Sequence, residues 1–279
     1  MLTILLASTT SVLFGCSDFL GGLASRRDSA FAVTANAHLV GLAIMAVAVF
    51  VWPAPFTLAD LGWGAAAGVA GGIGVTALYG ALALGRMGVV APITAALSGS
   101  LPALYDFLRG TSIRPLSLVG LAIALVAIVI VSASGHPDER AEVPLAAIAL
   151  AVLAGVGFTG SFIFFSLADA GSGLMPILAA RVVSFSVLAA ITIGRRGTAK
   201  LAPDALPAAL GAGFLDAGAN VTMLAAIRIG PLAVASVLGS LYPVITILLA
   251  RVVLGERLRA VQRVGVVLAL AAVALTAIR

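Results

Sequence analysis

Long apolar runs separated by short polar breaks organise the whole chain. Each run is close to the ~20 apolar residues that a helix needs to cross a bilayer. Charged residues, proline or glycine form the breaks, as is typical of the ends of apolar helices. The pattern predicts ten transmembrane helices, at about 2–24, 30–52, 60–84, 89–108, 115–134, 144–168, 174–194, 204–227, 231–254 and 261–278. The expected fold class is therefore an all-α polytopic membrane protein.

The longest polar break, residues 135–143, divides these helices five and five. Segment 82–88 aligns with 224–230 at a spacing of 142 residues, and Gly110, Arg114 and Gly120 match Gly255, Arg259 and Gly265 at a spacing of 145. Repeats are a common construction in membrane transport proteins. We therefore expect a first five-helix repeat in 1–134, a polar linker in 135–143 and a second repeat in 144–279. An odd number of helices per repeat makes the two halves inverted.

Composition excludes a water-soluble protein, because 62% of the residues are hydrophobic and only 10% are charged, whereas soluble chains have roughly 25% charged residues. The net charge of +5 comes mostly from basic residues in short gaps between apolar runs, where they orient helices in a membrane. We therefore expect no nucleic-acid partner. One cysteine, Cys16, and two histidines predict no disulfide, metal site or cofactor.

Three short motifs, one of them present twice, resemble a known family. They are an Arg-x-Gly link at Arg86 and again at Arg228, the sequence Leu254-Gly255-Glu256-Arg257-Leu258 before the last helix, and the stretch 17–27 that ends the first helix. With five plus five helices, they resemble the EamA-like branch of the drug/metabolite transporter superfamily over essentially the whole chain. The resemblance implies a transporter of small metabolites with a central cavity and without ATP. Thr111 stands opposite Glu256, so the first half lacks the acidic residue of that pattern.

Charged residues inside the predicted helices mark the candidate pathway, because ionised groups in a bilayer normally face protein or water. Asp216 lies near the middle of its helix, and Asn220 follows one turn later on the same face. Arg181 in the preceding helix is the expected partner of Asp216. The pair is interpreted either as a fixed structural bridge or as an arginine that exchanges Asp216 for a substrate carboxylate.

Asp18 lies about eight residues, or ~12 Å at 1.5 Å per residue, from the Arg26–Arg27 boundary. A carboxylate at that depth suits a group that alternately holds a proton and a cationic substrate. A capping aspartate beside Gly21 is the structural alternative. We expect one aqueous cavity, lined by Asp18, Tyr79, Asp216 and Asn220, at the interface of the repeats.

Two further polar features have alternative interpretations. Asp106 and Arg109 are three residues apart near a helix end, and this spacing predicts a local pair. His38 has the chemistry of a proton relay, or of a neutral hydrogen-bonding residue inside a helix.

Pro243 removes a backbone hydrogen bond and predicts a bend in the ninth helix.

The predicted function is a secondary transporter that moves small zwitterionic or cationic metabolites across the cytoplasmic membrane, as an exporter, with proton coupling as one option. A facilitative channel-like permease is the first alternative. An intramembrane enzyme is the second, and it lacks support because neither histidine lies in a catalytic motif. We therefore expect no enzyme activity. The expected partners are a small-molecule substrate and the lipid bilayer, with the protein a monomer or weak homodimer.

An even number of helices places both termini on the same side of the membrane. Basic residues concentrate in the gaps after odd-numbered helices, so the positive-inside rule places the termini outside. The family resemblance implies termini inside. The two arguments disagree, and the side stays open at this point.

Overall fold

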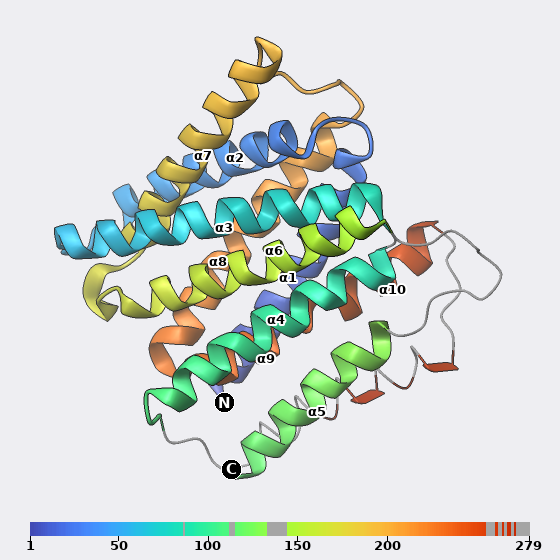
Figure 1. The fold of residues 1–279 in the computed structure, drawn as a ribbon. Coiled ribbons are helices and arrows are strands. Elements are labelled where there is room, and N and C mark those ends of the chain that lie inside the picture. The colour runs from blue at the N-terminus through green and yellow to red at the C-terminus, as the bar shows by residue number, and fades with distance from the viewer. Residues whose placement is uncertain are drawn as a thin grey trace.

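The computed structural model describes residues 1–85, 87–111, 115–132 and 144–254, together with positions 260, 261, 264, 267, 268 and 271. Regular structure within these ranges is helical (Figure 1). The helices are α1 Leu2–Ser25, α2 Ala30–Val51, α3 Leu58–Leu84, α4 Met87–Leu108, α5 Pro115–Ser132, α6 Leu145–Leu167, the 3-10 turn η1 Ala170–Ser172, α7 Met175–Arg196, α8 Leu206–Ile229, α9 Leu232–Gly239 and α10 Tyr242–Leu254.

Seven segments of the described chain are long and apolar enough to cross a membrane. They are α1, α2, α3, α6, α7, α8 and the stretch Leu232–Val253, which contains α9 and most of α10. An all-α, multi-pass membrane protein is therefore confirmed. The predicted linker 135–143 and the predicted last helix 261–278 lie largely or wholly outside the described residues.

The predicted ninth helix, 231–254, is divided into α9 and α10 at Ser240 and Leu241. Pro243 explains the division, because it has no N–H to donate to the carbonyl four residues earlier and its ring crowds that carbonyl. The Leu241 N–H instead bonds the Leu238 carbonyl at 3.2 Å, a tighter turn than an α-helix makes. The bend predicted at Pro243 is therefore a break in the helix, within a stretch, Leu232–Val253, that still has the length and composition of one membrane span.

Small residues allow the helices to approach closely. The α3 glycines at positions 64 and 68 pack against the backbone of α7 at Pro176 and Ala180. On α8, Gly213 packs in the same way against Ala37 of α2. Small side chains at four-residue spacing permit such contacts between membrane helices, so the backbones of the two halves meet directly.

Helices α3 and α8 have comparable sets of neighbours. α3 packs against α6 and α7, and α8 packs against α1 and α2. Similarly, α4 packs against α6, and α9 and α10 pack against α1. Figure 1 shows α3, α6 and α4 running side by side through the bundle. Each half therefore buries its helices against the other half.

We predict that Gly68→Ala destabilises the protein by about 1–3 kcal/mol, the usual cost of overpacking. A Cβ atom at position 68 would lie 2.6 Å from the Ala180 Cα. The control is Gly62→Ala on the same helix, where a Cβ meets nothing within 4 Å and alanine favours the helix. Thermal unfolding in detergent measures both variants. Equal melting temperatures for the two would contradict the close contact of α3 with α7.

Candidate functional site

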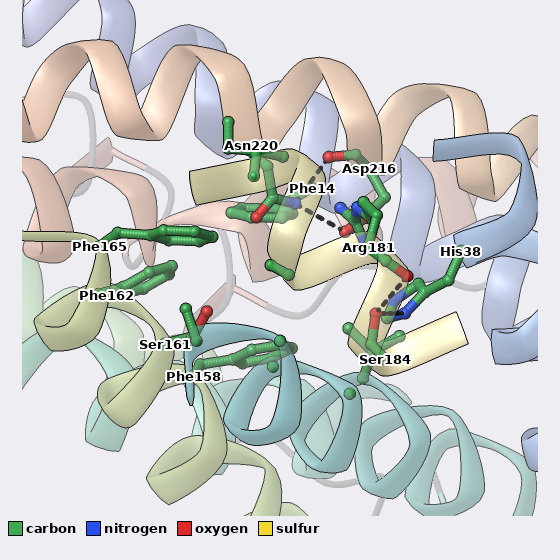
Figure 2. A pocket seen from close by; sticks show the side chains of 17 residues that line it. Phe14, His38, Phe158, Ser161, Phe162, Phe165, Arg181, Ser184, Asp216 and Asn220 are labelled. Atoms are coloured by element: carbon green, nitrogen blue, oxygen red, sulfur yellow. Dashed lines mark hydrogen bonds and ion pairs between the residues drawn. The ribbon is translucent and has the colours of Figure 1, made fainter. Parts of the chain in front are cut away.

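An ion pair between Arg181 of α7 and Asp216 of α8 is the centre of the candidate site (Figure 2). Each side chain is 6% exposed. Asn220, one turn further along α8, donates its side-chain amide to Asp216 Oδ1 at 3.2 Å. The Asp216 carboxylate therefore accepts hydrogen bonds from side chains of two helices, α7 and α8. The pairing of Arg181 with Asp216 that the sequence leads us to expect is present.

His38 of α2 lies beside this pair. Its Nδ1 is 2.8 Å from the Ser184 Oγ, one turn beyond Arg181 on α7. The Arg181 guanidinium packs over Gly41, where a Cβ would lie 3.0 Å from Nε. Within the described chain, neither the His38 Nε2 nor the Arg181 Nε has a hydrogen-bond partner. Two buried nitrogens are thus left to bind something else.

A small cavity of about 30 Å³, here called the polar cavity, lies between these groups and a set of phenylalanines. Figure 2 shows Arg181, Asp216 and His38 on one side and the rings of Phe162 and Phe165 on the other, with Phe14 beside Asn220. The volume is enough for a few water molecules at most, since one water occupies ~10–15 Å³ on this measure. Its lining includes His38, Arg181, Ser184, Asp216, Asn220, Ser161, Phe14, Phe158, Phe162 and Phe165.

A second cavity of about 10 Å³, here called the Asp18 cavity, lies beside the first. Three rings line both cavities and form a phenylalanine wall, defined as Phe14, Phe158 and Phe162. The ring centroids are 6.5 Å apart from Phe14 to Phe158 and from Phe158 to Phe162. The break between α9 and α10 closes the far side, with Gly239, Ser240 and Tyr242.

Asp18 itself is only 4% exposed. Within the described part of the chain it forms no hydrogen bond or ion pair. The two buried aspartates therefore differ, because an arginine neutralises the charge of Asp216, whereas Asp18 lines an aromatic cavity and has no ion-pair partner among the described residues.

Tyr79 lies outside both cavities. Its hydroxyl is 3.4 Å from the Ser17 Oγ, and its ring packs against Gly21, where α1 has no side chain. The ring fills the space between α1 and α3. The single cavity expected around Asp18, Tyr79, Asp216 and Asn220 is therefore divided, with Asp216 and Asn220 in one part and Asp18 in the other.

Asp106 and Arg109 do not pair with each other. Asp106 accepts the backbone N–H of Ala233 at 3.1 Å and the Thr111 hydroxyl at 2.8 Å, while Arg109 donates to the Tyr105 hydroxyl at 2.9 Å. A carboxylate at a helix start satisfies donors that have no partner within the helix. The predicted local pair is wrong, because the start of α9 binds Asp106 instead.

Reasoning from charged residues did not predict the phenylalanine wall or the two serines that line the polar cavity, Ser161 and Ser184. A signal was present, because Phe14 and Phe158, and likewise Ser17 and Ser161, are 144 residues apart, close to the repeat spacing. Ser98 and Ser240 are 142 apart and bond each other at 2.9 Å. An alignment of the two segments would have paired Phe14 with Phe158 and Ser98 with Ser240, and both pairs are in contact in the structure.

We predict that Asp216→Leu alone lowers the free energy of unfolding by about 3–5 kcal/mol, because it leaves a buried arginine without its partner. The double variant Arg181→Met with Asp216→Leu should regain most of that loss, since neither charge then remains buried. Thermal or denaturant unfolding of both variants in detergent measures the difference. Additive losses in the double variant would show that the two residues do not depend on each other.

Comparisons with known proteins show what this chain is similar to. The model described as "EamA-like transporter family" matches residues 145–278, the part that begins with α6. A solved structure titled "Crystal structure of protein" superposes with a TM-score of 0.72 and 18% identity, over 98% of this chain and 95% of that one. This similarity shows a shared fold. No curated protein matches the chain.

The matched range contains two of the segments that carried the resemblance, the link at Arg228 and the stretch 254–258. Residues 145–278 also supply Arg181, Asp216 and Asn220 to the site. Residues 145–278, just under half of the chain, match the EamA-like transporter family, and this match supports the resemblance to the EamA-like branch of the drug/metabolite transporter superfamily.

Proposed function

We propose that the protein is a secondary transporter that exports small zwitterionic or cationic metabolites across the cytoplasmic membrane. The observation that carries this proposal is the buried Arg181–Asp216–Asn220 group, which faces a cavity inside an apolar helix bundle. Ionisable groups at such depth mark substrate or ion pathways. The match of residues 145–278 to a transporter family supports the same function.

The reciprocal packing of α3 and α8 supports a construction from two inverted five-helix repeats, 1–134 and 144–279. The site itself follows the repeat, because His38 and Arg181 are 143 residues apart and both face the polar cavity. Inverted repeats place the substrate site at their interface and change access by moving against each other. The lining of the polar cavity, which comes from α1, α2 and α3 and from α6, α7 and α8, supports such a position.

The cavities of about 30 Å³ and 10 Å³ are too small for a metabolite, so the described conformation is closed around the site. Transport therefore requires the halves to separate. A wide cleft of about 710 Å³, lined by Asp106, Arg109 and Arg228 among others, opens at the end of the bundle where α4, α6 and α8 end. Substrate would enter or leave the site along this side.

The opposite end is held by polar contacts between the α1–α2 and α7–α8 connections. Arg196 pairs with Asp28, and the Ala202 N–H bonds Asp28 at 2.8 Å. Burial raises the pKa of Asp28, but the hydrogen bonds from Ala202, Ser29 and Arg196 outweigh it and hold that pKa below its usual value. Asp28 therefore stays ionised at neutral pH and keeps this end closed.

A zwitterionic substrate fits the charges of the site. Its carboxylate would accept hydrogen bonds from the free Arg181 Nε and from His38, and its ammonium group would meet a carboxylate. The substrate would then compete with Asp216 for the arginine. A buried pair is costly to break, so the exchange needs a substrate anion that replaces Asp216 directly.

Proton coupling is the driving force that we propose, because an aspartate that releases a cation is neutralised by a proton. The ionisable groups around Asp18 are Asp216, Tyr79 and Tyr242, with Arg181 paired to Asp216. The second candidate is a facilitative permease. It is favoured by the Arg181–Asp216 ion pair, since a permanently bridged Asp216 would not exchange a proton.

We predict that Asp216→Asn reduces transport at least tenfold while expression is retained. The test is flux in sealed proteoliposomes with an imposed pH gradient, screened over amino acids and organic cations. The control is Asp204→Asn at a surface pair whose side chains are more than half exposed, where transport should be unchanged. Full transport by Asp216→Asn would contradict the role of this residue. Flux that ignores both pH and voltage would replace proton coupling with facilitated diffusion.

We propose that the end with Arg26, Arg27, Arg195 and Arg196 faces the cytoplasm, following the positive-inside rule. Both termini then lie outside.

Cysteine labelling of whole cells measures this orientation. In a Cys16→Ala background, exposed Pro55→Cys should react with a membrane-impermeant maleimide, and exposed Thr198→Cys should react only after the cells are opened. The opposite result would place the termini inside.

A further inference from the structure

The Asp18 cavity combines one carboxylate with a set of aromatic rings. Its lining is Asp18, the three rings of the phenylalanine wall, Tyr242, and the small residues Gly239 and Ser240. The faces of aromatic rings attract cations, and cages of such rings bind alkylated ammonium groups. The cavity therefore has the components of a site for an organic cation.

Polar groups near Asp18 are already engaged elsewhere. Ser240 Oγ is 2.9 Å from Ser98 Oγ, and the Tyr242 hydroxyl reaches the Ala91 carbonyl at 3.4 Å. Arg181 is held by Asp216. Asp18, at 4% exposed, has no hydrogen bond or ion pair in the described part of the chain. A buried carboxylate without a partner is neutralised by a proton or by a bound cation.

We propose that Asp18 and the phenylalanine wall bind the ammonium group of the transported substrate, whereas Arg181 and His38 bind its anionic end. This inference rests on the proposed transport function and specifies the roles of the two aspartates. The wall lines both cavities, so the apolar part of a zwitterion bound at both ends would lie against its rings.

The lining of the Asp18 cavity favours alkylated ammonium groups. A primary ammonium group donates three hydrogen bonds, whereas the lining of this cavity consists mainly of aromatic rings, with Asp18 as its one charged side chain among the described residues. An N-methylated ammonium needs a single counter-charge and apolar contact, which the rings provide. The cavity of about 10 Å³ must widen to admit it. Its far side is the break between α9 and α10, where small side chains leave room for that movement.

The test measures cation binding separately from transport. Purified protein in detergent is titrated with tetramethylammonium chloride and with ammonium chloride, with sodium chloride as the salt control, and binding is followed by thermal stabilisation. We expect tetramethylammonium to bind more tightly than ammonium. Asp18→Asn should weaken tetramethylammonium binding at least tenfold, and Asp204→Asn should leave it unchanged.

A second pair of variants tests the rings, and stays informative if Asp18→Asn does not fold. Phe162→Leu should weaken tetramethylammonium binding about fivefold, within the range of cation–π energies. The control Phe164→Leu alters a ring that stacks on Trp63 outside the two cavities, and should bind normally.

Equal binding by wild type, Asp18→Asn and Phe162→Leu, or no binding by wild type, would overturn the inference. Substrate flux that persists in that case would leave the transport function standing. Conversely, Asp18-dependent binding in a protein that moves no solute would support the cation site and reject the transporter.

Discussion

The permanent charge of Arg181 determines which groups can lie next to it and how the neighbouring helices pack. A guanidinium does not lose its proton in a protein, so a buried arginine must have a partner or water, and in this bundle the partner is Asp216. The pair fixes how α7 and α8 face each other, and Asn220 and Gly41 complete its surroundings. Because the Arg181 Nε is not used by this pair, the same residue that stabilises the closed bundle retains a donor for a ligand. A structural bridge and a binding group are therefore compatible at this position.

Close backbone contact makes the small cavities possible. In a membrane the lipid is as apolar as the side chains, so helices associate through packing and polar contacts rather than through the hydrophobic effect. Glycines at positions 64, 68 and 213 bring helices of opposite halves together. The remaining space is confined to the places where phenylalanines meet polar residues. Separating the halves would expose those polar residues without unfolding any helix, since the helices hold their own backbone hydrogen bonds.

Helix positions were predictable from the sequence because the apolar length is set by the bilayer, and α1 to α8 begin and end within a few residues of expectation. The pair of Arg181 and Asp216 was predictable because two opposite charges in consecutive helices had few other partners. The location of Tyr79 was not, since it depends on the absence of a side chain at Gly21 on another helix. The Asp106 prediction failed because the free N–H groups of α9 compete with Arg109, and their proximity is a property of the fold.

Asp18 and Asp216 show why residue type and depth alone do not determine a role. Both are buried aspartates inside membrane-spanning helices, and sequence reasoning gave Asp216 the greater weight because it lies nearer the middle of its helix. In the structure, Asp18 rather than Asp216 is the better candidate for binding a cation. Asp216 receives an arginine and an amide, so its charge is compensated before any ligand arrives. Asp18 receives neither among the described residues, and three phenylalanine rings line its cavity. A buried carboxylate without a partner is neutralised by a proton or by a bound cation, and this property, rather than its depth in the membrane, makes Asp18 the stronger candidate for binding a cation during transport.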